Sequence, residues 1–238
     1  VKRVNYATEV SHDKQGRYEK DNPAEALAGI PGRGAGLMGL LSPILQTLEK
    51  SLVLNGLVWD HSDLPQAAVL VMLSDEAEPR VLLGRRAKHL KNHPGEIAFP
   101  GGKREPEDLT PWVTARREAW EEVGVGEELV HALGELSPLV TRTGFEVRPC
   151  IARVPAQLEL KIDYGEFDSL FTQPLSCFAD VDLFRLERMQ VNGAERMVPH
   201  YQINDDNIWG VTAAVLAMMA NIAYDAGLDL QRDWNARP

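Results

Sequence analysis

The sequence predicts an α+β fold, an α/β/α sandwich in which helices cover a mixed β-sheet. Short runs rich in Val and Leu alternate with a few amphipathic segments along the 238 residues. Hairpin-like connections join several of these runs, and repeated strand–helix–strand units are absent, which favours a sheet with both strand directions. A hydrophobic content of 44% is sufficient for one core. We therefore expect a single domain with an appended segment.

The appended segment is expected at residues 1–60, with the domain at residues 61–238. The string Gly29–Gly36 is rich in Gly and could cradle a phosphate, but no strand precedes it and no Lys-Ser/Thr pair follows it. A flexible lead-in is the alternative that we favour. Ser42 then suits a helix N-cap and Pro43 the first helical position. They predict one helix that ends near residue 52.

The remaining elements follow from local patterns in chain order. Strands are predicted at residues 67–73 and 80–83, joined by a hairpin-like connection. A helix is predicted from Pro111 to Val123, because Gly124 is a typical residue for ending a helix. Further elements are strands at 130–139 and 146–154, a short helix at 175–184, hairpin strands at 189–191 and 196–203 around Asn192-Gly193, and a helix at 208–225.

Three glutamates within the predicted helix 111–123 are the main functional signal. Glu118 reaches Glu121 at i+3 and Glu122 at i+4, so the three carboxylates share one helix face. Their mutual repulsion disfavours the helix, and a hard divalent cation such as Mg²⁺ or Mn²⁺ would remove it. The alternative is an acidic face exposed to water. The Gly-Gly pair that precedes the helix and Arg117 beside the first carboxylate favour a site.

Charge distribution narrows the class of partner. The net charge of −10 argues against nucleic acid or an anionic membrane surface. The stretch from Arg80 to Gly95 nevertheless holds five basic residues and no acidic one. Such a stretch could simply be solubilising. Next to a carboxylate cluster, it predicts a small polyanionic substrate held partly by a metal and partly by Lys and Arg.

The remaining composition predicts a cytoplasmic protein without a membrane span. The longest apolar stretch, Val211–Ala223, contains Thr212 and Asn221 and is too short to cross a bilayer. Cys150 and Cys177 are not part of a Cys-x-x-Cys or Cys/His cluster, so neither a disulfide framework nor a zinc site is expected. A reducing cytoplasm is the default location for such a chain.

The residues around the glutamates resemble the box of the Nudix hydrolases, which cleave nucleoside diphosphates linked to another moiety. The segment Arg117–Val125 matches the second half of that box, and Gly102 matches its first residue. The first half departs from the pattern. Asp108 stands where the family has Glu, and the following spacer is one residue longer. Glu107, one residue closer to the turn, is the alternative occupant.

A narrower resemblance, to the coenzyme A diphosphatase subgroup, covers residues 82–102. The segments Leu82–Ala87 and Gly95–Gly102 are similar to the subgroup's additional motif, although Gly84, Ala87 and Lys91 replace its Thr, Ser and Arg. Residues 143–149 and 208–213 also resemble stretches of that subgroup. At Ser169 relatives tend to carry a second Glu, and Glu166 or Asp168 could substitute for it. The first sixty residues have no recognised counterpart.

The resemblance implies a Nudix-type sandwich built around the box helix and roles for individual residues. It implies that Glu118, Glu121 and Glu122 bind Mg²⁺ or Mn²⁺, helped by the backbone carbonyl of Gly102. It also makes Glu118 the candidate that orients or deprotonates water, with Arg117 fixing the rotamer of a neighbouring carboxylate. The phosphate-binding candidates are Arg85, Arg86, Lys91 and Gly101, of which the glycine lets the backbone approach closely.

The activity that this resemblance implies is hydrolysis of coenzyme A or a derivative at its diphosphate. Another Nudix substrate, such as ADP-ribose, a dinucleoside polyphosphate or a nucleoside triphosphate, remains the alternative. A non-catalytic nucleotide-binding module is a third possibility, but it would predict damaged metal ligands. Dimerisation is frequent in the family, so the resemblance also makes a homodimer an expectation.

Overall fold

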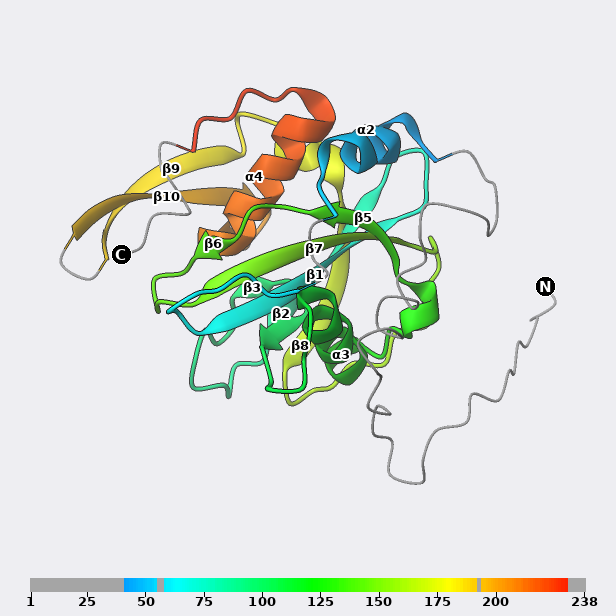
Figure 1. The fold of residues 1–238 in the computed structure, drawn as a ribbon. Coiled ribbons are helices and arrows are strands. Elements are labelled where there is room, and N and C mark those ends of the chain that lie inside the picture. The colour runs from blue at the N-terminus through cyan, green and yellow to red at the C-terminus, as the bar shows by residue number, and fades with distance from the viewer. Residues whose placement is uncertain (1–40, 55–57, 192–193, 231–238) are drawn as a thin grey trace.

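A computed structural model describes residues 41–54, 58–191 and 194–230 and confirms the predicted α+β sandwich with a mixed sheet. Figure 1 shows helices on both faces of the central sheet, with α2 (Pro43–Ser51) and α4 (Gly210–Tyr224) on one face and α3 (Pro111–Val123) on the other. The expected lead-in at residues 1–36 and the Asn192-Gly193 turn lie outside the described residues.

The central sheet has eight strands, arranged β3-β2-β1-β7-β5 with three further strands paired alongside. β1 and β7 are parallel, and the other pairings in this sheet are antiparallel. The strands are β1 (Gln66–Ser74), β2 (Arg80–Arg86), β3 (Ile97–Ala98), β4 (Gly101–Lys103), β5 (His131–Glu135), β6 (Leu139–Val140), β7 (Glu146–Val154) and β8 (Phe167–Pro174). The hairpin predicted at residues 67–83 is therefore confirmed as β1 and β2.

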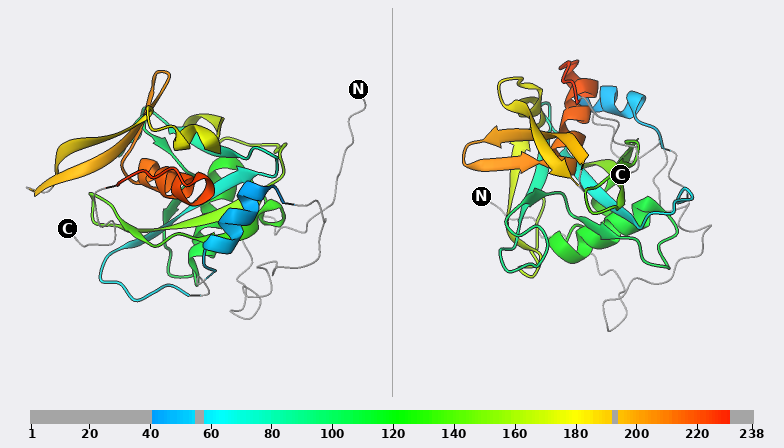
Figure 2. Two further views of the ribbon diagram at one scale, coloured as in Figure 1. Left: turned by 90° about the horizontal axis from the view of Figure 1, so that it is seen from above. Right: turned by 90° about the vertical axis from the view of Figure 1, so that its left-hand side faces the viewer.

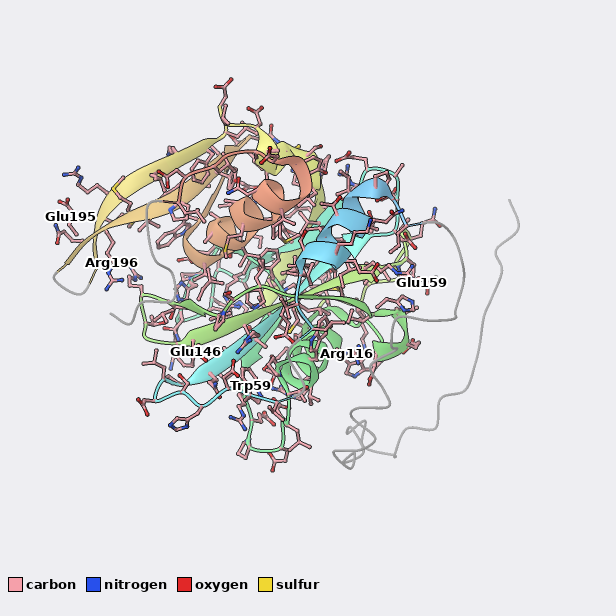
Figure 3. All side chains as sticks on the ribbon, turned by 45° about the horizontal axis from the view of Figure 1, so that its top comes forward. Trp59, Arg116, Glu146, Glu159, Glu195 and Arg196 are labelled. Carbon is pink, nitrogen blue, oxygen red and sulfur yellow. The ribbon has the colours of Figure 1, made fainter. Side chains whose placement is uncertain are left out.

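A second, three-stranded sheet rises beside α4. It consists of β9 (Phe184–Val191), β10 (Ala194–Ile203) and β11 (Asp206–Trp209), all antiparallel. Figure 2 shows the β9–β10 hairpin projecting from the body of the molecule, and Figure 3 shows Glu195 and Arg196 at its far end. The hairpin that the Asn-Gly pair predicts is thus present, with longer strands than expected.

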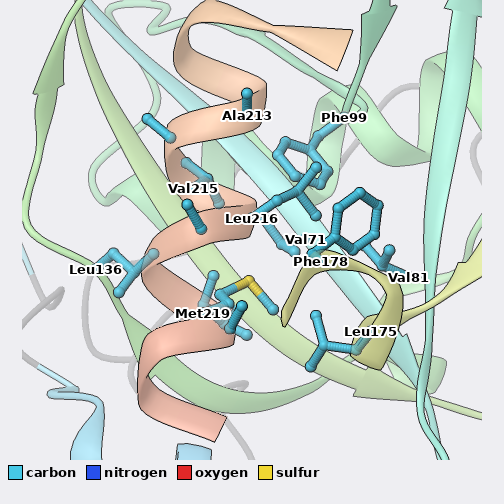
Figure 4. Close-up of a cluster of buried hydrophobic side chains, with 14 of the residues drawn as sticks. Val71, Val81, Phe99, Leu136, Leu175, Phe178, Ala213, Val215, Leu216 and Met219 are labelled. Atoms are coloured by element: carbon cyan, nitrogen blue, oxygen red, sulfur yellow. The ribbon is translucent and has the colours of Figure 1, made fainter. Parts of the chain in front are cut away.

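Alternation along β1 divides the core between the two faces of the sheet. Val71 and Leu73 face α2 and α4, whereas Leu70 and Met72 face α3, as the two-residue period of a strand requires. Figure 4 shows part of the first cluster, in which Met219 of α4 packs near Phe178. Both faces of the sheet are therefore covered by an apolar layer, and the layer on one face fixes α3 against the sheet.

Several predicted element boundaries were wrong. The strand predicted at 130–139 is divided into β5 and β6, because Pro138 has no N–H for a sheet ladder. The helix predicted at 175–184 is only a short 3₁₀ turn, Leu175–Ala179, since the chain enters β9 at Phe184. The helix predicted from residue 208 starts at Gly210, after β11.

The single helix of the predicted extension belongs to the same core as the domain. In α2, Leu45 and Leu48 are fully buried in the cluster that also contains α4. Ser42 caps this helix as predicted, with its Oγ accepting from the amide of Leu45 at 3.3 Å.

Across the described residues, no helix combines the length and the apolar character needed to span a membrane.

Candidate active site

Local capping sets the position of the acidic helix α3. The Thr110 side chain accepts a hydrogen bond from the amide of Val113 at 3.2 Å, and Pro111 occupies the first turn. At the other end, Gly124 adopts a left-handed conformation with φ 72°, and its amide donates to the carbonyls of Ala119 and Trp120. Both helix ends predicted from the sequence are confirmed. The three glutamates consequently lie in the last two turns, on one side of the helix.

A cavity of about 300 Å³ lies between the end of α3, the Gly-Gly strand β4 and the turn that precedes β8. It is lined by Arg86, Gly101, Gly102, Glu118, Glu121, Glu122, Asp163 and Glu166. Five of these eight residues are acidic and one is basic. A cavity with this lining suits a cation together with an anionic ligand, and does not suit an apolar molecule.

Arg117 connects the carboxylates on one side of the cavity. Its Nη1 lies 3.0 Å from Glu118 Oε1 and 3.3 Å from Glu121 Oε2. Its Nη2 donates to Asp108 Oδ2 at 2.9 Å and to the carbonyl of Lys103 at 3.1 Å. The side chain of Arg117 is only 12% exposed, so these contacts hold it in one orientation. Arg117 therefore restrains both Glu118 and Glu121.

The structure places Asp108, and not Glu107, against this arginine. Asp108 is buried and also accepts hydrogen bonds from the amide of Glu105 and the hydroxyl of Thr114, whereas Glu107 is exposed. Burial alone would raise the pKa of Asp108, but its hydrogen bonds from Arg117, Glu105 and Thr114 outweigh that effect and lower the pKa. Asp108 has a shorter side chain than the Glu of the family box, and the spacer after it is one residue longer, yet its carboxylate still contacts Arg117.

Negative charge on the cavity side of α3 is only partly compensated. Burial, with added repulsion from Glu118 and Glu166, raises the pKa of Glu122 to about 8, despite a 2.9 Å hydrogen bond from the amide of Gly101. Burial also raises the pKa of Glu118, although Arg117 opposes the shift. The site therefore brings several carboxylates together in a place where burial destabilises their charged form.

The acidic side chains that line the cavity have the chemistry to bind a hard divalent cation. Their present positions, however, do not surround a single point where a cation could bind. In the part of the chain that the structure describes, no group of three or more acidic, His or Cys side chains has the spacing of a ready-made metal site. Arg117 currently holds two of the carboxylates. At Gly102, a Cβ would lie 2.3 Å from Glu118 Oε1, so only glycine lets that carboxylate approach β4. Glu118, Glu121 and Glu122 carry carboxylate oxygens, and oxygen is the type of ligand atom that Mg²⁺ and Mn²⁺ prefer.

Glu166 and Asp163 reach the cavity from a turn far along the chain. The amide of Asp163 donates to the carbonyl of Glu122 at 2.8 Å, and the amide of Glu166 donates to the carbonyl of Asp163 at 3.0 Å. This docking onto the end of α3 brings both side chains to the cavity. Asp168 instead accepts from the amide of Lys88 at 3.2 Å, and Ser169 lies opposite Arg85 in the sheet. Asp163 carried no recognisable signal in the sequence.

The basic candidates separate because strand neighbours point to opposite faces. Arg86 lines the cavity, where its Nη2 lies 3.4 Å from Glu166 Oε2. Arg85 forms an ion pair with Asp206 of β11, away from the lining residues. Lys91 is exposed on the loop between β2 and β3 and does not line the cavity either. Of the three cations proposed for phosphate binding, the structure brings only Arg86 to the glutamates.

Gly84 has a structural explanation. A Cβ at this position would lie 2.3 Å from Cδ1 of Phe167, whose ring is fully buried. The residue that replaces the Thr of the additional motif therefore accommodates an aromatic ring from β8. Glycine at position 84 is thus explained by packing against Phe167 and gives no information about the substrate.

Comparison with known proteins places this fold and site in a family. The NUDIX domain model matches residues 64–175. A protein of Yersinia pestis (strain Pestoides F) named Uncharacterized Nudix hydrolase NudL is 37% identical over 155 residues, which cover 65% of this chain and 78% of that protein. The chain belongs to the Nudix hydrolase family. It is accordingly a hydrolase of phosphoric anhydrides in nucleoside diphosphate derivatives, and members of this family generally use divalent metal ions.

Solved structures give more distant matches. A Nudix hydrolase from Alicyclobacillus acidocaldarius is 19% identical and covers 73% of this chain and 98% of its own, with a TM-score of 0.44. An Ap4A hydrolase from C. elegans, solved as a binary complex, is 20% identical and covers 46% of this chain and 80% of its own, with a TM-score of 0.40.

Proposed function

We propose that the protein hydrolyses the diphosphate of coenzyme A or a coenzyme A derivative with the help of Mg²⁺ or Mn²⁺. The products are 4′-phosphopantetheine, free or acylated, and adenosine 3′,5′-bisphosphate. One observation carries the proposal: Arg86 of β2 and the Gly101-Gly102 pair of β4, from the segment that resembles the coenzyme A subgroup, line the same cavity as the three glutamates. Two motifs that lie apart in the sequence thus contribute to one site.

Glu118, Glu121 and Glu122 are the proposed cation ligands, with the carbonyl of Gly102 and the carboxylate of Glu166 as further donors. A bound divalent cation would neutralise non-bridging oxygens of the diphosphate and lower the pKa of a coordinated water. The contact between Glu122 and the amide of Gly101 fixes the distance between α3 and β4. Glu166 takes the place of the glutamate that relatives carry at the position of Ser169.

Glu118 is the proposed residue that orients or deprotonates the attacking water. Its raised pKa suits proton acceptance, and Arg117 holds its Oε1 at 3.0 Å and so limits its rotamers. On the opposite wall, Arg86 is positioned to contact a phosphate oxygen, because its guanidinium already faces an oxyanion, Glu166. Arg117 is a positioning residue in this scheme.

Incubation with coenzyme A and either metal tests the proposal. Mass spectrometry should detect both products in stoichiometric amounts, and no product when EDTA replaces the metal. Absence of turnover with Mg²⁺ and with Mn²⁺ would overturn the substrate assignment. The metal-free sample and a Glu121→Gln variant serve as controls for contaminating activity.

A different nucleoside diphosphate derivative is the second candidate. The observation that favours it is the absence of Arg85 and Lys91 from the cavity lining, which leaves one of three expected cations beside the glutamates. Parallel kcat/KM measurements on coenzyme A, ADP-ribose, a dinucleoside tetraphosphate and a nucleoside triphosphate discriminate the candidates. The preferred substrate should exceed the others by at least about tenfold in kcat/KM, about 1.4 kcal/mol of transition-state stabilisation.

Two further expectations accompany this function. A homodimer follows from the family resemblance, and light scattering at micromolar concentration would measure twice the chain mass of 26.4 kDa. A cytoplasmic location agrees with Cys150 and Cys177, which are both free thiols. Fractionation of cells that produce the protein tests that location.

A further inference from the structure

Trp59 links the segment before β1 to the acidic helix α3. Its indole Nε1 donates a buried hydrogen bond to the backbone carbonyl of Asp108 at 3.1 Å. Trp59, labelled in Figure 3, lies outside residues 64–175, the range that the NUDIX domain model matches. The side chain is 9% exposed and belongs to the same buried cluster as Trp112 of α3. A residue that precedes the matched domain thus contacts the residue that holds Arg117.

The carbonyl of Asp108 accepts from a second donor, Arg104 Nε, at 3.4 Å. The guanidinium of Arg104 also lies near the Trp59 ring, with Cζ 5.4 Å from the ring centroid. Gln66, the first residue of β1, holds Arg104 twice, because its carbonyl accepts from the Arg104 amide at 3.0 Å and its Oε1 accepts from Nη1 at 2.9 Å. Trp59 and Arg104 therefore tie the backbone of Asp108 to the start of β1.

The carboxylate of Asp108 competes with the glutamates for Arg117. Arg117 Nη2 donates to Asp108 Oδ2 at 2.9 Å, whereas Nη1 contacts Glu118 and Glu121. A cation that binds Glu118 and Glu121 has to displace the Nη1 contacts but can leave the Nη2 contact in place. If Asp108 moved away, Arg117 would pair more strongly with the two glutamates and compete with the cation. The position of Asp108 thus affects how readily the glutamates exchange the guanidinium for a cation.

We infer that Trp59 and Arg104 are positioning residues for the proposed cation site and act through Asp108 and Arg117. Neither side chain is among those that line the carboxylate cavity, so their role is indirect. They hold Asp108 where its carboxylate retains Arg117 while the glutamates bind the cation. The inference rests on the proposed function, because it concerns the affinity of the same glutamates for Mg²⁺ or Mn²⁺.

Calorimetric titration with Mn²⁺ in the absence of substrate tests the inference. Trp59→Phe keeps an aromatic ring but removes the N–H donor, and it should raise the dissociation constant for Mn²⁺ about fivefold, the size of one hydrogen bond between uncharged groups. Arg104→Gln changes an exposed side chain, so the core stays intact, and it should raise the dissociation constant about twofold. An unchanged value in Trp59→Phe overturns the inference. Should that variant not fold, an unchanged value in Arg104→Gln does so.

A double-mutant cycle tests the route through Asp108. Asp108→Asn removes the charge that retains Arg117 and should by itself raise the Mn²⁺ dissociation constant about tenfold. In that background, Trp59→Phe should have no further effect, because the group that it anchors no longer holds Arg117 by charge. Equal losses from Trp59→Phe in the two backgrounds would show that Trp59 acts by another route, and the inference would be wrong.

Trp112→Phe is a matched control within the same buried cluster. The Trp112 Nε1 also donates one buried hydrogen bond, to Glu135 Oε1 at 2.8 Å, and Glu135 does not line the carboxylate cavity. The substitution should lower the melting temperature at least as much as Trp59→Phe and leave the Mn²⁺ dissociation constant unchanged. If both variants weaken Mn²⁺ binding equally, the effect comes from general loosening of the core and the inference is overturned.

The same titration separates failure of this inference from failure of the proposed function. If the unmodified protein binds neither Mn²⁺ nor Mg²⁺, the proposed cation site is wrong and the inference fails with it. If the unmodified protein binds Mn²⁺ and Trp59→Phe binds it equally well, the proposed function stands and only the role of Trp59 is overturned.

Discussion

Two arginine–carboxylate clusters in this protein consist of the same residue types but differ in charge balance. Arg148 of β7 pairs with Glu135 of β5 at 3.3 Å and with Asp60 of the segment before β1. The second Glu135 oxygen accepts from Trp112 Nε1 at 2.8 Å. Around Arg117, in contrast, one guanidinium faces Asp108, Glu118 and Glu121, while the carboxylate of Glu122 accepts a hydrogen bond from a backbone amide, that of Gly101.

The difference indicates a structural role for the Arg148 cluster and a cation-binding role for the Arg117 cluster. At Arg148 one guanidinium faces two carboxylates, those of Glu135 and Asp60, and the cluster joins the chain before β1 to the sheet. At Arg117 one guanidinium faces three carboxylates, so this cluster is the less balanced of the two, and its excess negative charge costs stability that a bound cation would recover. The family assignment agrees with this distinction, because the unbalanced cluster is the one on the box helix.

The largest expected effect is on activity, at the unbalanced cluster. Glu121→Gln should lower kcat about 1000-fold, or about 4 kcal/mol, because a proposed cation ligand is lost. Thermal stability should be unchanged or slightly higher, since repulsion with Glu118 decreases. Steady-state kinetics and thermal denaturation measure the two effects. A near-normal rate would show that the ligand set is wrong, and Glu128→Gln, an exposed change of the same charge, should be silent.

At the Arg148 cluster, the expected effect is on stability. Glu135→Gln should lower the free energy of unfolding by about 3 kcal/mol, because it leaves the buried guanidinium of Arg148 without its buried charged partner. Urea denaturation measures the loss. The kcat of the folded variant should match that of the unmodified protein. A variant with full stability and reduced kcat would reverse the roles that we assign to the two clusters.

Divalent cation should stabilise only one of the clusters. A saturating concentration near 100 times the dissociation constant should raise the free energy of unfolding by about 2.7 kcal/mol. Glu135→Gln should retain this increase, and Glu121→Gln should lose most of it. Differential scanning calorimetry with Mg²⁺, Mn²⁺ and EDTA provides the measurement without any substrate. Equal stabilisation of both variants would place the cation elsewhere.

The smallest expected effects distinguish the basic residues. Arg86→Gln should raise the KM about tenfold, equivalent to about 1.4 kcal/mol, because Arg86 faces the glutamates across the cavity. Lys91→Gln should change the KM by less than about twofold, as expected for an exposed charge screened by salt. Comparable effects from the two variants would indicate that the β2–β3 loop closes over the substrate.

Elements with local signals were predicted well from the sequence. The ends of α3 follow from Thr110, Pro111 and Gly124, which act on their own turn of the chain, so no tertiary information is needed. β8 was missed because its alternation is poor and its pairing with β2 is long-range. The division of residues 130–139 has a local cause in Pro138, which has no N–H for the sheet ladder, so the sequence did carry that signal.

For the site, the sequence alone determined the three glutamates on one helix face, because helical periodicity is a local property. Only the tertiary structure decided that Asp108, and not Glu107, contacts Arg117, and that Glu166 and Asp163 complete the cavity from more than forty residues away. It also separated Arg86 from Arg85 and Lys91. Those outcomes depend on strand register and on how a distant turn docks against α3, and both are set by packing of the whole sheet.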